Sequence, residues 1–308
     1  QNITLGGDLT ISGGNLTKGT SILLDTNSMV IQSTGGGTGN TIFGKAAGNS
    51  FTGDDADNNS LFGENTGTAL TTGDDNVIVG SNAGATATTS SGLTLVGKNA
   101  GFAINSADAD QTIAIGRSAL ATLTSGQKNV AIGYTGQYRN TTGDSNTTVG
   151  YGAGYSVSTG TYNTFIGHRA GYGDGTALSG TENSGFGYRA LQALTSGNYN
   201  VAVGRAGEAI TTGLSNIGIG YYALKTNIDG DHCIAIGSQA LEDFEASSDG
   251  DGQNIAIGHQ ASKEATTPVR NTFIGYGSGL GDASNKMTGL DNTCLGYLSG
   301  KSLILSAN

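Results

Sequence analysis

One short motif recurs fifteen times along this chain, and the repeat constrains the fold more than any other feature. The motif reads Asn, an apolar residue or Thr, a small residue, an apolar residue and then Gly, with a small residue again three positions later. Neighbouring anchor glycines are most often about 17 residues apart, and insertions lengthen some of the spacings; such a period predicts a solenoid in which each repeat forms one coil. The anchors are Gly44, Gly63, Gly80, Gly97, Gly116, Gly133, Gly150, Gly167, Gly187, Gly204, Gly220, Gly237, Gly258, Gly275 and Gly296.

The motif predicts a short strand that is apolar on both faces. The residue before the anchor is apolar in all fifteen repeats, as at Ile132, and the residue two positions earlier is Val, Ile, Thr or Ser, as at Val130. These two residues share one face because strand side chains alternate. The residue between them, Ala131 in this repeat, points the other way and is also small or apolar throughout. A doubly apolar strand needs cover on both sides, so we expect one face to fill the coil and the other to pack against sister chains in an obligate homotrimer.

Two polar columns suggest how the coils turn. Asn lies four residues before the anchor in twelve repeats, and Leu93, Thr112 and Cys233 replace it in the others. Stacked Asn side chains can bond one another along a solenoid, so we expect a ladder. Gly lies seven residues before the anchor in ten repeats, where we expect it to supply a positive φ in a tight turn. Each coil should then contain a short strand, a Gly corner, a second short strand, a loop and a turn, with fifteen coils making a rod of roughly 70 Å.

The repeat divides the chain into three parts. Residues 1–36 alternate apolar and polar residues with Gly punctuation and suggest a β-rich cap or a join to a shaft. Residues 37–300 are expected to form an all-β, parallel β-solenoid, and residues 301–308 are expected to cap its last coil. The longer spacings mark insertions, and loops on a rigid scaffold often carry binding. The insertions favoured as recognition loops are 171–182, 241–253 and 279–291.

Three segments carry a resemblance to two related groups: Asn129-Val-Ala-Ile-Gly-Tyr-Thr-Gly, Asn163-Thr-Phe-Ile-Gly-His-Arg-Ala-Gly and Thr195-Ser-Gly-Asn-Tyr-Asn-Val-Ala-Val-Gly. The pattern resembles the YadA-type head of trimeric autotransporter adhesins, a left-handed parallel β-roll. It also resembles the Asn-Thr-Ala-Ile-Gly-Tyr-rich repeats of phage tail fibres. The Thr-Thr-Gly turn and the Gly-Tyr corner favour the phage form, and the likeness covers about residues 37–300.

The resemblance implies a homotrimeric virion tail fibre that attaches to a host surface glycan and joins other virion tail proteins. The alternative that it leaves open is a trimeric adhesin head on a bacterial cell surface, an extracellular location. A remote third reading is an ice-binding solenoid, because hydroxyls form a column interrupted by charged and bulky residues. That column holds Thr72, Thr142, Thr159, Thr212, Thr267 and Thr288.

Charge and motif content argue against other classes. The net charge of −10 without a basic stripe argues against nucleic acid as a partner. No apolar run is long enough for a membrane span. No nucleophile motif, paired-carboxylate site or phosphate loop stands out, so we expect neither enzymatic activity nor a cofactor. Asp pairs such as Asp229 and Asp231 match only fragments of a calcium loop and are better explained as turn acids. Cys233 and Cys294 lie three coils apart, roughly 14 Å, so we expect two buried thiols and no disulfide between them.

The position after the anchor gives the candidate receptor-binding residues. Six of the twelve tyrosines fall in this column, together with histidines and arginines such as Arg117 and Arg205. One interpretation is an exposed stripe that stacks on sugar rings, and the other, which we favour, is a ladder that stabilises the corner. The candidates are Tyr134, Tyr151, His168, Tyr188, Tyr221, Tyr276 and Tyr297.

Overall fold

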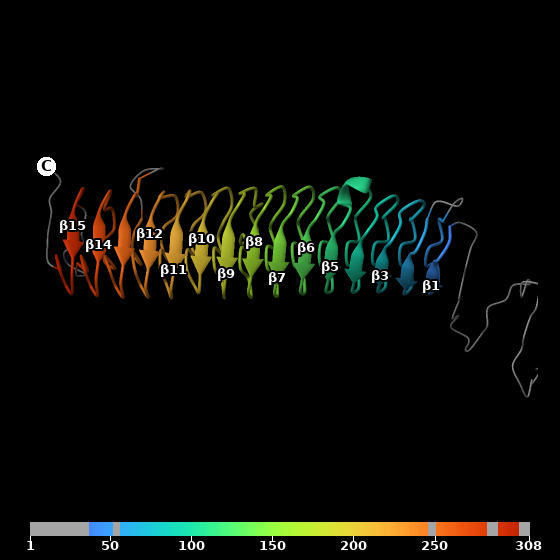
Figure 1. Cartoon of the computed structure of the whole chain (residues 1–308), viewed down its shortest axis with the longest axis horizontal. Helices are drawn as coiled ribbons and strands as arrows, with labels where there is room; N and C mark the ends of the chain where they lie inside the picture. The colour runs from blue at the N-terminus through green and yellow to red at the C-terminus, as the bar shows by residue number, and fades with distance from the viewer. Residues whose placement is uncertain (1–36, 52–55, 246–250, 282–288, 302–308) are drawn as a thin grey trace, which may run out of the picture.

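The chain forms a single straight solenoid in a computed structural model that describes residues 37–51, 56–245, 251–281 and 289–301 (Figure 1). Fifteen three-residue strands pair in parallel and in chain order in one sheet. The predicted parallel β-solenoid is therefore confirmed over the described residues. The proposed cap at 1–36 and all but Lys301 of the proposed cap at 301–308 lie outside them. The strands are β1 (Thr41–Phe43), β2 (Ser60–Phe62), β3 (Val77–Val79), β4 (Thr94–Val96), β5 (Ile113–Ile115), β6 (Val130–Ile132), β7 (Thr147–Val149), β8 (Thr164–Ile166), β9 (Ser184–Phe186), β10 (Val201–Val203), β11 (Ile217–Ile219), β12 (Ile234–Ile236), β13 (Ile255–Ile257), β14 (Thr272–Ile274) and β15 (Thr293–Leu295).

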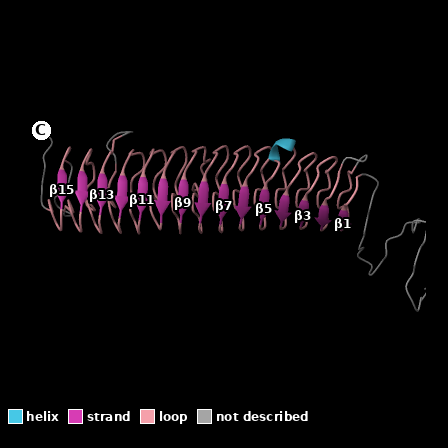
Figure 2. Cartoon of the chain, viewed as in Figure 1, coloured by secondary structure: helices cyan, strands magenta, loops and turns pink. Residues whose placement is uncertain are grey.

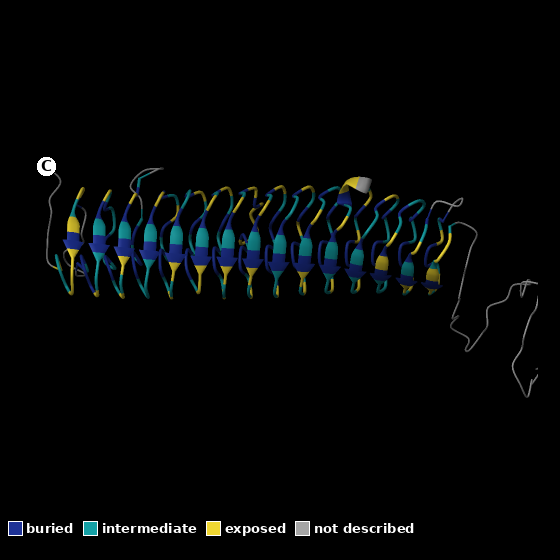
Figure 3. Ribbon diagram, viewed as in Figure 1, coloured by how far each residue is buried: buried dark blue, intermediate teal, exposed yellow. Residues whose placement is uncertain are grey.

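Each coil, numbered here by its strand, directs the central strand residue inward and the two flanking residues outward (Figure 3). Ala131 and Phe165 are fully buried, whereas Ile132 and Ile166 are exposed. The register does not slip at insertions, since Ile234 still pairs with Ile255 although the coil between them is one of the longest. The two-faced strand predicted from the motif is thus present, and its central residue is the one that fills the coil.

In most coils, the central strand residue and the residue four positions after the anchor share one space; coil 10, where the fourth position is Glu208, is an exception. A Cβ added at Gly171 would lie 2.5 Å from the ring of Phe165, and one added at Gly279 would lie 2.4 Å from Phe273. Where the strand residue is small, as at Gly218, the later position holds a buried Leu224. Leu224 has a φ of 51°, a left-handed conformation that costs a non-glycine residue about 1–2 kcal/mol. Filling the core offsets that cost.

The predicted Asn ladder is confirmed. Asn163 Nδ2 donates to Asn146 Oδ1 at 3.1 Å and to the Gly180 carbonyl at 2.8 Å. Asn183 then donates through Nδ2 and through its backbone N–H to Asn163 Oδ1, both at 3.0 Å. These side chains are fully buried, so the ladder satisfies polar groups that no water reaches.

Two predictions about the turns are wrong. From Gly73 to Gly230, the glycine seven residues before the anchor does not have a positive φ; that φ belongs to the residue two positions later, for example Ser145 at 55°. Gly143 is needed because a Cβ there would lie 2.3 Å from the carbonyl oxygen of Gly160 in the next coil. The second short strand is also missing from the described residues, where Figure 2 shows turns, one strand per coil and a 3-10 helix at Ala107–Ala109.

The acidic turns have a structural role. Asp110 Oδ1 accepts from the Ser91 backbone N–H at 2.7 Å, and Asp231 Oδ1 accepts from that of Leu214 at 2.6 Å. Each carboxylate thus caps the equivalent turn of the preceding coil. In the described part of the chain, no three His, Cys, Asp or Glu side chains gather as a metal site would need.

Cys233 and Cys294 are free, buried thiols. No described helix has the length and apolarity to cross a membrane.

Candidate binding surface

The aromatic residues after the anchors of coils 6 to 9 form one continuous stack. Tyr134 stacks on Tyr151 with ring centroids 5.4 Å apart, and Tyr151 stacks on His168 at 5.1 Å. His168 stacks in turn on Tyr188 at 5.4 Å. The three tyrosines remain 44–48% exposed. Since neighbouring rings cover each other's faces, the exposed portion consists of ring edges and phenol hydroxyls.

The other predicted members of this column lie apart from that stack. His259, Tyr276 and Tyr297 form a second, shorter stack with centroids 5.2 and 5.4 Å apart. Tyr221 has no ring partner in its column among the described residues and instead contacts its sequence neighbour Tyr222, with centroids 3.9 Å apart. Of the seven candidates, four therefore lie in the first stack, Tyr276 and Tyr297 lie in the second, and Tyr221 lies in neither. Ring-face stacking on sugars is not available inside either stack.

A second aromatic ladder lies four residues further along the same corner turn. Tyr138, Tyr155 and Tyr172 stack with centroids 5.4 and 5.0 Å apart. Sequence reasoning missed this ladder, although the three tyrosines follow one another at the period of the repeat. The signal that would have found it is that all three tyrosines occupy the same position within the repeat, five residues after the anchor.

Arginines cover the ends and flanks of both ladders. Arg117 lies over the Tyr134 ring at 5.9 Å and Arg205 over Tyr188 at 5.5 Å, at opposite ends of the first stack. On the second ladder, Arg139 lies over Tyr155 at 5.6 Å and Arg169 over Tyr172 at 4.9 Å. These distances are within the range of cation–π attraction.

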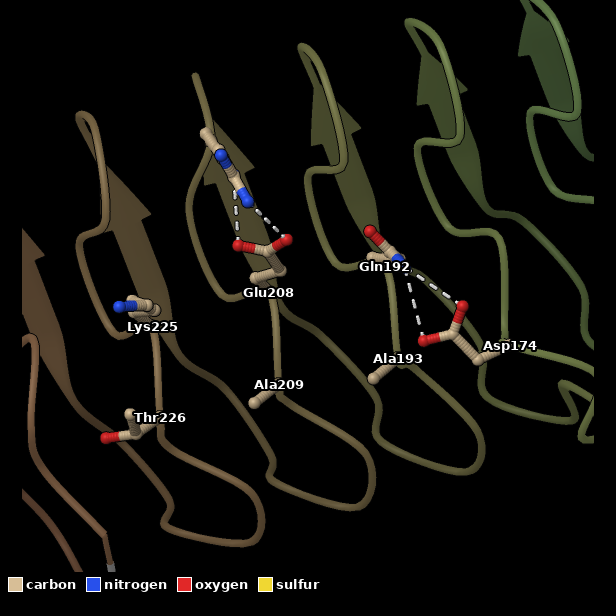
Figure 4. A pocket seen from close by; sticks show the side chains of 8 residues that line it. Asp174, Gln192, Ala193, Glu208, Ala209, Lys225 and Thr226 are labelled. Atoms are coloured by element: carbon tan, nitrogen blue, oxygen red, sulfur yellow. Dashed lines mark hydrogen bonds and ion pairs between the residues drawn. The ribbon is translucent and has the colours of Figure 1, made fainter.

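An open groove of about 480 Å³ crosses coils 8 to 11 beside the ladders (Figure 4). Arg205 and Glu208 pair with each other, Asp174 accepts from Gln192 Nε2 at 2.9 Å, and Lys225 pairs with Glu242, which does not line the groove. Glu208 accepts from Arg205 Nε at 3.0 Å and Nη2 at 2.9 Å, and from Arg189 Nη1 at 3.3 Å. The lining residues are Asp174, Gln192, Ala193, Arg205, Glu208, Ala209, Lys225 and Thr226.

The pKa of Glu208 reflects these contacts. Partial burial of the carboxyl pushes the pKa upward, but the hydrogen bonds and charges of Arg205 and Arg189 outweigh burial and hold it below its usual value. The same pairing raises the pKa of Arg205, mainly through its hydrogen bond to Glu208. Glu208 thus stays ionised and keeps both guanidinium groups occupied.

The outward face of the sheet carries a column of apolar residues along the rod. Ile132, Ile166 and Ile257 on this face are 37–39% exposed, and an apolar residue occupies the same column in every coil. Figure 3 shows these flanking positions as half-buried or exposed along the full length of the sheet. Contiguous apolar patches of this kind mark interaction surfaces in soluble proteins.

The proposed recognition loops are only partly described. The insertion after coil 8 is described, and its Gly175 carbonyl accepts from Arg139 Nη1. Residues 246–250 and 282–288, which include Thr288 of the hydroxyl column, lie outside the described part. Thr142, Thr159 and Thr212 of that column are exposed.

Comparison with known proteins does not assign this chain to a family. The chain matches no family model, no curated protein and no solved structure.

Proposed function

We propose that the chain is the repeat segment of a homotrimeric virion tail fibre that attaches to a host cell surface through multivalent contacts with a surface glycan. The coils are proposed to wind in the left-handed sense of the β-roll that the sequence resembles. Such a segment would extend away from the virion as a stiff rod and present the same chemical groups at regular intervals.

The observation that carries the proposal is the outward apolar face of the sheet. A coil this short encloses little more than one strand side chain and the two or three side chains that face it. An uncovered stripe of Ile, Val and Phe would leave a contiguous apolar surface in water, and such surfaces mark interaction sites in soluble proteins. Packing that stripe against sister chains removes it from water and adds about 25 cal/mol for every Å² of apolar surface buried. The number three comes from the resemblance to trimeric fibres and adhesin heads.

Attachment by many weak contacts follows from the repeat. Three chains would each present the Tyr134–Tyr188 stack, so one polymer could engage several rungs and several chains at once. Linking weak sites in this way raises overall affinity without a stronger single contact.

Light scattering on the purified chain tests the assembly. We expect a particle of three chain masses that dissociates or fails to form in an Ile132→Asp, Ile166→Asp variant. The matched control is Thr142→Asp, which places a charge on an exposed turn away from the sheet. A folded monomer of the unaltered chain would overturn the trimer.

Adsorption assays test attachment. The purified chain is expected to bind host cells and to block adsorption of the virus whose genome encodes it. An upstream signal peptide and a downstream membrane barrel in the full gene would instead support the bacterial adhesin. Thermal hysteresis of freezing would support the ice-binding alternative, and its absence would remove it.

A further inference from the structure

The segments that follow the anchors of five consecutive coils contain no acidic residue, although Asp174 directly follows one of them and accepts a hydrogen bond from Gln192 Nε2. The six residues after the anchors of coils 5 to 9 hold four arginines, six tyrosines and a histidine, and no Asp or Glu. The chain as a whole has 24 acidic residues against 14 Lys and Arg, so this face reverses the sign of the chain's charge. We call residues 117–122, 134–139, 151–156, 168–173 and 188–193 the basic corner face.

Three of the four arginines on this face have no carboxylate partner among the described residues, although Arg139 Nη1 donates a hydrogen bond to the Gly175 carbonyl. Arg117, Arg139 and Arg169 make no ion pair with any residue that the structure describes. Of the four arginines, Arg189 alone has a carboxylate partner in the described part, Glu208. The basic face therefore ends at the groove, where Glu208 neutralises Arg189 and Arg205.

The aromatic residues contribute hydrogen-bond donors. The Tyr134, Tyr151 and Tyr188 rings cover one another's faces and expose their edges. Their hydroxyls make no hydrogen bond within the described residues. A phenol hydroxyl can donate and a guanidinium only donates, so the face offers donors in excess. The strongest acceptors for such donors are anionic oxygens.

We propose that the basic corner face binds an acidic saccharide chain lying along the rod, with its carboxylate or sulfate oxygens accepting hydrogen bonds from Arg117, Arg139, Arg169 and the tyrosine hydroxyls. This inference rests on the proposed attachment function and names the chemistry of its target. The net charge of −10 does not prevent it, because charges beyond roughly 8 Å are largely screened at physiological salt.

Geometry favours a saccharide over a single-stranded nucleic acid. Binding of bases depends on open aromatic faces on which they stack. The rings here already stack on one another at 5.0–5.4 Å, which leaves only edges for a ligand. A polymer with an acidic group on successive sugars instead meets a donor at each coil.

The test measures binding of the full chain to four polymers of matched length: polygalacturonate, polysialate, dextran sulfate and neutral dextran, with oligo-dT as a fifth probe. We expect binding to at least one acidic polysaccharide, weakened by salt, and none to dextran. An Arg139→Gln, Arg169→Gln variant should bind about tenfold or more weakly, because charged hydrogen bonds are lost. Arg270→Gln removes one positive charge, from an exposed pair with Asp291 far along the rod, and should bind normally.

A Tyr134→Phe, Tyr151→Phe variant separates binding from structure. It keeps the ring stack and removes two hydroxyls, so we expect unchanged thermal stability and weaker binding. Failure to bind any acidic polymer, equal binding of dextran, or preferential binding of oligo-dT would each overturn the inference. If the chain adsorbs to host cells equally well with and without the Arg139 and Arg169 charges, this inference fails while attachment stands. If the chain binds an acidic polymer but does not adsorb to host cells, this inference stands and the proposed attachment function fails.

Discussion

Phe165 and Gly171 fill one space between them: a Cβ at Gly171 would lie 2.5 Å from the Phe165 ring. Coil 11 solves the same packing problem in reverse, with Gly218 in the strand and Leu224 in the later position. A Cβ built at Gly218 lies 3.7 Å from Leu224 Cδ1, an ordinary contact. The two positions therefore act as a pair whose summed volume matters more than either residue.

Exchanging the sizes of this pair should reveal the coupling. Phe165→Ala is expected to cost about 3–5 kcal/mol of unfolding free energy through the cavity it leaves. Gly171→Leu should cost about 2–4 kcal/mol from overpacking and from its φ of 57°. The double variant should lose less than the sum, with a coupling of about 0.5–3 kcal/mol in urea denaturation. Gly175→Leu is the control, since it has a φ of 90° but open space around it. Strict additivity would contradict the shared space.

Breaking the Asn ladder in the middle should destabilise the rod strongly. Asn163→Ala leaves the Gly180 carbonyl and the Asn183 N–H without their partners. We expect a loss of about 2–4 kcal/mol, because each buried unsatisfied group costs about 1–3 kcal/mol. Thr142→Ala, on the exposed turn column, should change the denaturation midpoint little. Equal effects of the two substitutions would mean that the ladder adds no stability.

The Glu208 carboxylate should make stability depend on pH. Burial raises its folded pKa, but Arg205 and Arg189 outweigh burial and lower it, so its contribution is present above the unfolded Glu pKa of about 4.3. That contribution is lost as the pH falls through the folded value. Urea titrations between pH 7 and pH 3 should show the unaltered chain and Glu208→Gln converging toward the acidic end. A constant difference across that range would contradict the linkage.

Cys233 should be inert in the folded rod. Burial raises the pKa of its thiol to about 11, and the thiolate is the reactive form. In a Cys294→Ser background, we expect alkylation at pH 8 only when the chain is denatured. Because the folded thiol resists ionisation, its contribution to stability is present below about pH 8.5 and is lost as the pH rises toward 11. Rapid labelling of the native protein would show that coil 12 opens locally.

Periodicity predicted much of this fold because each column has one physical task. The alternation around Ala131, the Asn163 rung and the number of coils all follow from aligning the repeats. The glycines were only partly predictable. Aligning the repeats shows which positions require Gly, but it does not show whether the cause is a positive φ or a close neighbouring atom. At Gly143 the neighbour is the next coil's carbonyl, a contact that exists only after stacking.

The candidate surface was less predictable for a similar reason. The sequence placed Tyr134 and Tyr151 in one column, yet the availability of ring faces depends on side-chain rotation that no column encodes. The pairing of Arg189 with Glu208 joins different columns of neighbouring coils, and the coil that carries Glu208 is shorter than most. Irregular spacing hides such contacts from any alignment.

Because Ile234 pairs with Ile255 across one of the longest spacings, the number of coils sets the length of the rod. The register is also kept between Thr164 and Ser184, so extra residues between two strands do not change the spacing of the strands along the rod. Adding or losing a whole coil changes the length by one strand spacing, about 4.8 Å, and leaves the stacking rules of its neighbours intact. The length of the rod and the size of its insertions can therefore change independently, the first by whole coils and the second by single residues.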